Sequence, residues 1–410
     1  MLQVTTHASA DNPAAAQYRH PGLVLLALAI GGFAIGTTEF AAMSLVPYFA
    51  PDLGIQATTA GHVISAYALG VVIGAPVIAV LAARLPRRTL LVGLMLLFAL
   101  GNGLSALAPT YGWLVAFRFL SGLPHGAYFG VAALVAASLV PRDRRSQAVS
   151  RVLAGLTVAT MVGVPLANLI GQLVGWRWSF GLVALLALLT ATLVRIYAPQ
   201  GAPSAGASAL RELGALRRGQ VWLTLATGAI GFGGMFAVYT YLASTMLEVT
   251  HAEAWTIPVM LTVFGFGMTI GNLVCAWLAD RGVMRAAGAT LVWSTIALAL
   301  YPFATGSVWT LAPLVFLIGC GGGLGTILQT RLMDVAEDAQ TLAAALNHSA
   351  FNTANALGPW LAGLVLGAGF GFPATGWVGV ALALGGLGIW GVSLAADRQK
   401  LSEARMSRAA

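Results

Sequence analysis

The chain has 410 residues, of which 58% are hydrophobic and only 8% are charged, and its mean hydropathy is +0.85. A typical soluble domain carries about 25% charged residues, so this composition excludes a disordered chain and argues strongly against a soluble enzyme. The formal net charge of +8 comes almost entirely from arginine, because Lys400 is the only lysine. A helical protein that crosses the membrane many times remains.

Apolar stretches long enough to span a bilayer follow one another along the whole chain. A spanning helix needs about 20 such residues, and twelve stretches qualify: 22–48, 60–82, 89–108, 111–140, 147–174, 176–198, 220–246, 255–279, 286–304, 308–333, 341–369 and 373–396. The first is too long for the apolar core of a secretory signal, so we expect it to be an uncleaved helix. The connectors are mostly short and end the helices with proline or arginine.

The basic residues predict the orientation. Apart from Arg118 and Arg177, every lysine and arginine falls on one side of this arrangement, whereas the opposite loops carry Asp52, Glu248 and Glu253. Positive charge marks the cytoplasmic side, so we expect both termini in the cytoplasm and the protein in a bacterial inner membrane. The charge also predicts affinity for anionic lipid. It does not indicate nucleic acid binding, because no basic stretch is long or interleaved with stacking aromatic residues.

A polar segment rich in Pro, Gly, Ser and Ala divides the chain into six spans and six spans. We therefore expect a cytoplasmic tail over 1–19, a first six-helix bundle over 20–198, a flexible cytoplasmic linker over 199–219, a second bundle over 220–396 and a cytoplasmic tail over 397–410. The predicted fold is all-α, with twelve transmembrane helices in two pseudo-symmetric bundles.

An internal repeat supports this division. At an offset of 197 residues, Gly70 and Gly74 map onto Gly267 and Gly271, and Arg84 maps onto Arg281. The same offset maps Gly122 and Gly126 onto Gly319 and Gly323. Helices in lipid associate through small residues that let their backbones approach closely. We predict that these glycines lie at helix crossings; a high glycine content common to membrane helices is the alternative explanation.

Several motifs resemble those of one family. They are Gly36-Thr-Thr-Glu39-Phe40 with Pro47 in the first span, Ser65 to Pro76 in the second, Arg118-Phe-Leu-Ser-Gly122 in the fourth, and the stretch with Gly155, Gly163, Pro165 and Gly171 in the fifth. With these, the chain over about 20–396 resembles the major facilitator superfamily. Within it, the chain is similar to the twelve-helix drug:proton antiporters that include sugar-efflux and arabinose-efflux-permease-like proteins.

One motif departs from the family pattern. The superfamily's loop after the second helix normally reads Gly-x3-Asp-Arg-x-Gly-Arg-Arg, whereas here Ala83 replaces the acidic residue before Arg84, and Arg87 and Arg88 follow. The second-half copy keeps Asp280 and Arg281. The resemblance implies gating by these loops. A carboxylate there would latch onto the positive N-terminal end of a neighbouring helix, so we expect Asp280 to matter more for the gate; the arginines equally fit a plain topology signal.

Two charged residues lie inside predicted spans. Charge at membrane depth costs about 2.5–3.5 kcal/mol and marks a functional site by default. Glu39 and Arg118 both lie roughly 10–14 Å below the outer surface. We expect them to face a shared water-filled cavity, where Glu39 binds the exchanged proton or a cationic substrate and Arg118 tunes it or holds an anionic group. A static ion pair is the simpler alternative.

Other polar residues in the spans are candidates for the same cavity. His125 follows the helix breaker Pro124 and is a candidate proton relay, although a neutral histidine bonded to a carbonyl fits equally well. His348, Asn352 and Asn355 share one face of the eleventh span. Tyr239, in the seventh span, points to the opposite side from Tyr241, and one of the two is expected to line the cavity.

No motif supports catalysis or a bound cofactor. The sequence holds no metal-binding spacing, and Cys275 and Cys320 are expected to be small apolar residues within spans. We expect no cofactor or metal, and as partners only a small-molecule substrate, protons and lipid, for a protein that functions as a monomer. The predicted function is proton-coupled efflux by alternating access. A proton-coupled importer, or a ligand-gated sensor or channel of the same fold, remains open.

Overall fold

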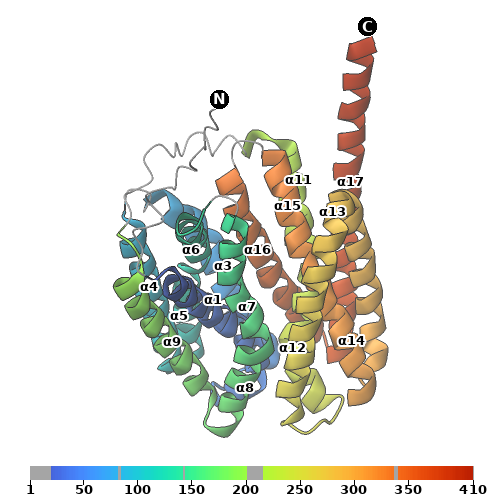
Figure 1. Ribbon diagram of the computed structural model, residues 1–410. Coiled ribbons are helices and arrows are strands. Elements are labelled where there is room, and N and C mark those ends of the chain that lie inside the picture. The colour runs from blue at the N-terminus through green and yellow to red at the C-terminus, as the bar shows by residue number, and fades with distance from the viewer. Residues whose placement is uncertain (1–19, 82–84, 142–143, 201–215, 337–339, 410) are drawn as a thin grey trace, which may run out of the picture.

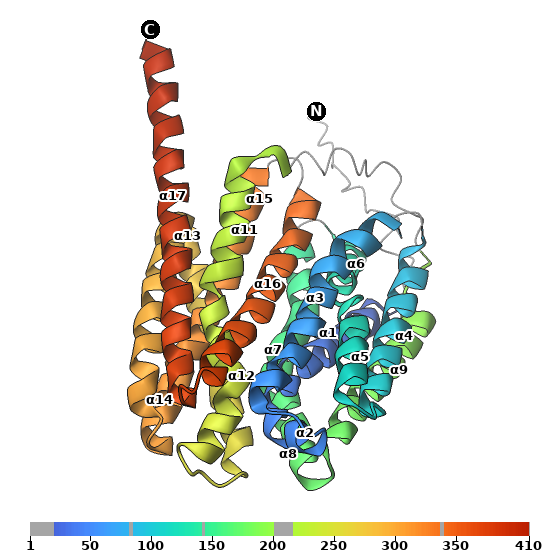
Figure 2. The same cartoon turned by 180° about the vertical axis from the view of Figure 1, so that it is seen from behind.

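The computed structural model describes residues 20–81, 85–141, 144–200, 216–336 and 340–409, and these ranges are helical apart from short connectors. The helices up to residue 197 are α1 (Pro21–Ser44), α2 (Val46–Asp52), α3 (Ala57–Leu81), α4 (Arg87–Ala106), α5 (Tyr111–Gly122), α6 (His125–Ser138), α7 (Arg145–Val158), η3 (Ala159–Gly163), α8 (Val164–Leu173) and α9 (Trp176–Tyr197). Those that follow are α11 (Gly219–Gly231), α12 (Gly233–Glu248), α13 (Thr256–Ala304), α14 (Val308–Cys320), η5 (Gly321–Gly323), α15 (Leu324–Ala336), α16 (Gln340–Gly367), η6 (Phe372–Ala374) and α17 (Thr375–Ala409). Figures 1 and 2 show them as a set of long, roughly aligned helices.

Within the described ranges, ten helical segments are long and apolar enough to cross a membrane. This confirms the prediction of an all-helical protein with many membrane spans. One of the ten, α13, has 49 residues and covers two of the predicted stretches. Gly282 interrupts it with φ 152° and ψ 101°, a backbone conformation that glycine adopts readily.

Two breaks inside the spans of the first half shape the backbone. Pro124 precedes α6, at the position where the sequence predicts a kink, because its ring cannot continue the preceding helical hydrogen bonds. Between α7 and α8 the chain forms the single π-helical turn η3, directly before Pro165. Such turns occur mainly as local bulges in helices and often lie at functional sites; no sequence pattern predicts this one.

The crossing of α3 and α5 depends on glycine. A Cβ atom added to Gly70 would lie 2.2 Å from the carbonyl oxygen of Phe119, and one added to Gly74 would lie 2.1 Å from that of Leu123. The same atom on Gly70 would meet the Cα of Gly122 at 3.1 Å. The two backbones therefore touch, as the small-residue spacing predicts.

The crossing of α13 and α14 repeats this geometry in the second half. A Cβ atom on Gly267 would lie 2.3 Å from the carbonyl oxygen of Phe316, and one on Gly271 would lie 2.1 Å from that of Cys320. All four residues stand 197 positions after their counterparts at the first crossing. The internal repeat is therefore a repeat of helix contacts as well as of residues.

Helices from the two ends of the chain also pack together. The most extensive contact of this kind joins α3 and α16, which lie side by side in both views (Figures 1 and 2). Contacts of α13 with α8 and η3, of α1 and α2 with α12, and of α6 with α16 add to the interface. Hydrogen bonds cross it from the Ser65 hydroxyl to the Ala356 carbonyl (2.9 Å) and from the Gln172 amide to the Ala254 carbonyl (2.9 Å).

Three exposed tryptophans lie together at one end of the molecule. Trp178, Trp255 and Trp309 lie at or just before the starts of α9, α13 and α14, and their side chains are 63–88% exposed. Tryptophan at the ends of apolar helices is typical of the membrane–water interface. This end lies opposite the C-terminal part of α17 (Figures 1 and 2). The sequence predicted only a tail from residue 397, but α17 continues as a helix to Ala409 and projects beyond the other helices.

Candidate functional site

Glu39 lies on α1 at the interface between helices from the two ends of the chain. Its side chain is only 7% exposed, and its Oε1 atom accepts a hydrogen bond of 3.2 Å from the Nδ2 atom of Asn355 on α16. The next residue, Phe40, contacts the rings of Phe236 and Tyr239 on α12, with centroids 6.1 and 5.7 Å apart. The carboxyl group thus sits beside an aromatic cluster and makes one direct link from α1 to α16.

Arg118 is fully buried on α5 and reaches the same segment of α1. Its NH1 atom donates to the Thr38 hydroxyl (3.0 Å) and its NH2 atom to the Thr38 carbonyl (3.4 Å). The guanidinium carbon lies 4.3 Å from the ring centroid of Tyr67 and 5.2 Å from that of Phe180, within the range of cation–π attraction. Arg118 forms no ion pair with Glu39, so the static pair that was the simpler alternative is absent; the arginine instead binds Thr38, the residue before Glu39.

Thr38 and Asn102 were missed by the sequence analysis. The Thr38 hydroxyl donates to the Oδ1 atom of Asn102 (2.7 Å), and the Nδ2 atom of Asn102 donates to the Phe98 carbonyl (2.9 Å) on α4. A chain of hydrogen bonds therefore links Arg118 on α5 to Thr38 on α1 and, through Thr38, to Asn102 on α4. A single threonine or asparagine in an apolar run carries no sequence signal, because its partner lies far away in the chain.

His125 begins α6 and is buried beside Tyr67. Its Nδ1 atom lies 3.0 Å from the Tyr67 hydroxyl, and its ring contacts those of Phe129 and His348, at centroid distances of 5.4 and 6.2 Å. His348 in turn stacks face to face on Phe129 at 5.4 Å. Tyr67 therefore connects Arg118 with His125, and the two histidines meet across the α6–α16 contact. Gly126 packs closely against α3.

The predicted polar stripe on α16 faces the same region. Asn355 is fully buried and Asn352 is 3% exposed. The amide nitrogen of Asn352 donates to the His348 carbonyl one turn earlier (3.0 Å). The Oδ1 atoms of both asparagines have no hydrogen-bond partner among the described residues. A buried amide oxygen without a partner costs free energy, so this stripe retains unused acceptor capacity next to Glu39.

The two tyrosines of α12 point in different directions, as predicted. Tyr239 packs against Phe264 with centroids 4.2 Å apart and lines a small void with residues of α12, α13 and α14. The Tyr241 hydroxyl instead donates to the Pro359 carbonyl of α16 (3.2 Å). Tyr239 therefore belongs to the aromatic cluster beside Phe40, whereas Tyr241 holds α12 against α16.

The helix that carries Glu39 is held by close contacts with α7 and η3. A Cβ atom on Gly155 would lie 2.0 Å from the Ala29 carbonyl, and one on Gly163 would lie 2.2 Å from the Thr37 hydroxyl. Pro165 follows at the start of α8. The glycines predicted to pack helices thus set the position of α1, and with it the position of the carboxyl group.

The first gating loop is described in part. Arg84 lies outside the described residues, and Arg87 and Arg88 are half-buried at the start of α4. The NH1 atom of Arg88 donates to the Ala198 carbonyl, just after α9 (3.4 Å). The contact fixes the start of α4 against the end of α9.

The second gating loop lies at the Gly282 break. Asp280 is exposed and makes no ion pair with any described residue. Arg281 lies over the ring of Trp277, 3.5 Å from its centroid, and donates to that residue's carbonyl (2.9 Å). Among the described residues there is no latch contact from Asp280.

Groups that hold metals or form disulfides do not gather here. In the part of the chain that the structure describes, no three side chains of histidine, cysteine, aspartate or glutamate are placed to bind a metal ion. Cys275 and Cys320 are both free thiols within helices. The site therefore consists of one carboxyl group, one guanidinium, two imidazoles, amides and aromatic rings.

Apolar helices packed around such a polar centre are typical of a membrane transporter. The family model described as Major Facilitator Superfamily matches residues 28–336 and also 244–409. The chain belongs to the Major Facilitator Superfamily.

Named relatives agree with this assignment. The chain is 39% identical to "Inner membrane transport protein YdhP" of Escherichia coli (strain K12) over 366 residues, which cover 88% of this chain and 94% of the relative. It is 37% identical to a "Chloramphenicol resistance protein" of Streptomyces lividans (84% and 89% covered) and 30% identical to a "Probable sugar efflux transporter" of Pasteurella multocida (88% and 90% covered). These relatives and the family are transporters, so the chain is a membrane transport protein and not an enzyme.

Proposed function

We propose that the protein is a proton-coupled efflux antiporter of the bacterial inner membrane. Two relatives named for drug resistance and sugar efflux support export. The buried carboxyl group of Glu39 supports proton coupling, because a titratable group inside a membrane protein marks an ion or proton pathway. The observation that carries the proposal is the hydrogen bond from Asn355 to Glu39.

This bond supplies a way to couple protonation to helix movement. An ionised carboxylate only accepts hydrogen bonds, whereas a protonated one also donates. Protonated Glu39 can therefore donate to the Asn355 Oδ1 atom, which has no other partner among the described residues, and pair with both ends of the amide. Binding a proton then changes the link between α1 and α16, the helices that carry the two residues.

The surrounding groups set the conditions for this exchange. Arg118 on α5 and Tyr67 on α3 are the charged and titratable groups that act on Glu39, and Tyr239 on α12 contacts the next residue, Phe40. Arg118 is held by Thr38 and keeps a positive charge near the carboxyl group. His125, bonded to Tyr67, is our candidate for passing the proton onwards from this cluster.

Amphipathic aromatic drugs of the chloramphenicol type are the substrates we propose. The aromatic cluster of Phe40, Phe236, Tyr239 and Phe264 offers ring faces, and the amides of α16 offer hydrogen bonds. Binding sites for such molecules combine apolar walls with few polar groups. A sugar needs more hydrogen-bonding groups, yet one relative is named for sugar efflux, so sugars belong in the same test.

We further propose twelve spans in two bundles, 20–198 and 220–396, with alternating access between them. The repeated glycine crossings and the break at Gly282 support this arrangement, as does the separation of α1–α9 from α11–α17 in Figure 2. The linker over 199–219 lies mostly, and the N-terminal tail over 1–19 wholly, outside the described residues. We place both termini in the cytoplasm because the basic loops lie at that end, and we propose a functional monomer.

We assign gating to two loops, the one that follows α3 and the one at Gly282. In the first, Arg88 links α4 to the end of α9; Arg87 precedes it in the sequence, and Arg84 stands four positions earlier. In the second, Asp280 and Arg281 precede Gly282, so a change of backbone conformation at that glycine would bring the exposed carboxylate to a new partner.

Transport by purified protein in proteoliposomes tests the proposal. With an imposed proton gradient, the vesicles should transport labelled chloramphenicol against its concentration gradient, in the direction opposite to proton flow. Dissipating the gradient should abolish this uphill transport. A labelled sugar panel run in parallel shows which substrate class is moved.

Three results would contradict the proposal. Uphill flux in the same direction as protons would indicate an importer. Only downhill flux would indicate a channel, and no flux of any compound would favour a sensor of the same fold.

A further inference from the structure

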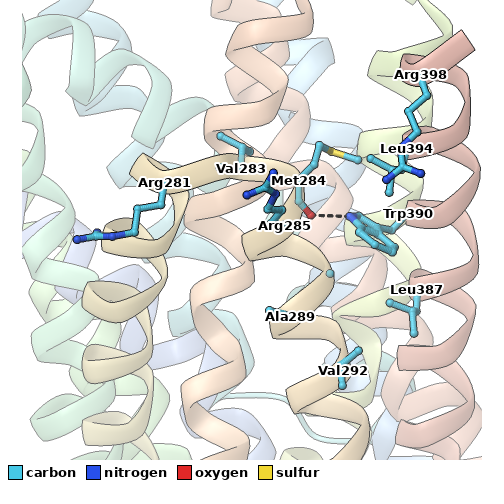
Figure 3. A pocket seen from close by; sticks show the side chains of 12 residues that line it. Arg281, Val283, Met284, Arg285, Ala289, Val292, Leu387, Trp390, Leu394 and Arg398 are labelled. Atoms are coloured by element: carbon cyan, nitrogen blue, oxygen red, sulfur yellow. Dashed lines mark hydrogen bonds between the residues drawn. The ribbon is translucent and has the colours of Figure 1, made fainter.

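A cavity of about 710 Å³ lies far from Glu39, between α13 and α17. It opens beside the Gly282 break, where the chain turns back into the second part of α13. Figure 3 shows Arg285 and Arg398 around its upper part, with Val292 and Leu387 below. Of the transport residues discussed above, only Arg281 and Gly282 line it, and the guanidinium of Arg281 points away from α17, over Trp277.

The charged end of the cavity has no acidic partner among the described residues. Arg285 and Arg398 are both exposed, and neither forms an ion pair with a described side chain. The acid next to Arg398 is Asp397, and it is already bound by Arg331 on α15. Two guanidinium groups therefore face the cavity with their charge uncompensated, and guanidinium groups bind phosphate oxygens in a bidentate manner.

The other end is apolar and is lined by Val292 and Leu387 (Figure 3). Trp390 lines the cavity above them: the indole nitrogen donates to the Met284 carbonyl (2.8 Å), and the ring packs on the backbone of Gly288. From Arg285 to Val292 the helix rises about 10 Å. The cavity therefore changes from cationic to apolar along the direction in which a lipid stands in the membrane.

From this we propose that the cavity binds the phosphate of an anionic diacyl phospholipid, with the headgroup between Arg285 and Arg398 and an acyl chain along Val292 and Leu387. The orientation rests on the proposed cytoplasmic location of this end, where anionic lipids are attracted to basic residues. A free inorganic anion would use only the arginines and would leave the apolar part of the cavity uncovered. Basic pockets between membrane helices are known to take lipid headgroups in this way.

Native mass spectrometry of delipidated protein with added phosphatidylglycerol or phosphatidylcholine tests this inference. The wild type should retain phosphatidylglycerol in preference to phosphatidylcholine. The double variant Arg285→Gln/Arg398→Gln should lose about fivefold in affinity per arginine, about 25-fold in all, and with it the preference. The matched control Arg145→Gln/Arg151→Gln removes two exposed arginines on α7 and should bind as the wild type does.

A second variant tests the acyl-chain part of the site. Ala289 is exposed and lines the cavity, so Ala289→Phe should fill it and weaken binding of both lipids. Equal binding of phosphatidylglycerol by the arginine variant and the wild type would overturn the proposal. Binding of inorganic phosphate by the wild type with no retention of either lipid would overturn it in favour of a free anion. Binding is measured without transport, so failure of proton antiport leaves this result unaffected.

Discussion

Arg118 shows how a buried charge is accommodated by single residues. Its side chain is fully buried, yet its partners are an uncharged hydroxyl, a carbonyl and two aromatic rings. The planar fork of arginine fits this arrangement, because two nitrogens reach the two oxygens of Thr38 while the flat face lies on Tyr67. A lysine in place of Arg118 would keep the positive charge but would lack the planar group that makes both hydrogen bonds to Thr38.

We therefore predict that Arg118→Lys destabilises the protein by about 1.5–3 kcal/mol, the loss expected for hydrogen bonds to a buried charged group. The thermal unfolding midpoint of detergent-solubilised protein should fall accordingly. The control Arg151→Lys, at an exposed position on α7, should unfold with the wild type. Equal midpoints for all three proteins would show that the contacts to Thr38 contribute nothing.

Asp52, at the end of α2, is expected to make the stability of the protein depend on pH. Hydrogen bonds from Arg177 and from the Trp176 indole hold the pKa of Asp52 below its ordinary value. A lowered pKa means that the folded state favours the ionised carboxylate. The stabilisation is therefore complete above the ordinary pKa of about 3.9 and is lost as the pH falls through the lower, folded-state pKa.

For Asp52→Asn we predict a small loss of stability at pH 7, below about 1 kcal/mol because the pair is partly exposed. The difference between the unfolding midpoints of wild type and variant should shrink as the pH is lowered below about 4. A difference that is constant from pH 7 to the lowest accessible pH would contradict an ionic origin.

At the scale of helices, the packing of the transporter is set by backbone contacts at glycine. Gly74 and Gly271 occupy equivalent places in the two halves, each within about 2.1 Å of a carbonyl once a Cβ is added. No side-chain rotation relieves such a clash, so the helices must separate.

Gly74→Ala and Gly271→Ala should therefore each cost about 1–3 kcal/mol, measured as a drop in the thermal unfolding midpoint. Gly93→Ala is the matched control, because nothing lies within 4 Å of its added Cβ and alanine favours the helix. Midpoints for the first two variants that equal that of Gly93→Ala would contradict close packing at these crossings.

The helices themselves could largely be predicted from sequence, because apolar run length decides membrane insertion. The predicted stretches coincide with the helices to within a few residues at most ends. The exception is the end of α17: the apolar run ends near residue 396, while Glu, Arg, Ala and Lys, which favour helix, continue to Ala409. The π-turn η3 had no signal of its own.

The candidate site was predictable only in part. Glu39 and Arg118 stand out because charge is costly within a span, and periodicity placed Asn355 on the face of His348. That Asn355 meets Glu39, and that Arg118 binds Thr38, depends on how distant helices pack. No spacing within one sequence contains that information.

For the whole molecule, alternating access requires the two ends of the chain to move apart. Gln172 of α8 and Ala254 before α13 are hydrogen-bonded across this interface. In a cysteine-free background, a reducible cross-link between Gln172→Cys and Ala254→Cys should abolish transport, and reduction should restore it.

The control cross-link joins Asp52→Cys and Arg177→Cys, both within 20–198 and already in contact in the wild type. It should leave transport unchanged, because both positions move together. Full transport with the 172–254 cross-link in place would show that the two parts need not separate at this end.

Proton coupling through Glu39 is the central claim, and transport by Glu39→Gln in proteoliposomes measures it most directly. Glutamine keeps a hydrogen bond to Asn355 but cannot exchange a proton. The variant should still exchange labelled for unlabelled substrate without a gradient, and it should lose all uphill transport driven by a proton gradient. Equal proton-driven accumulation by variant and wild type would contradict the account.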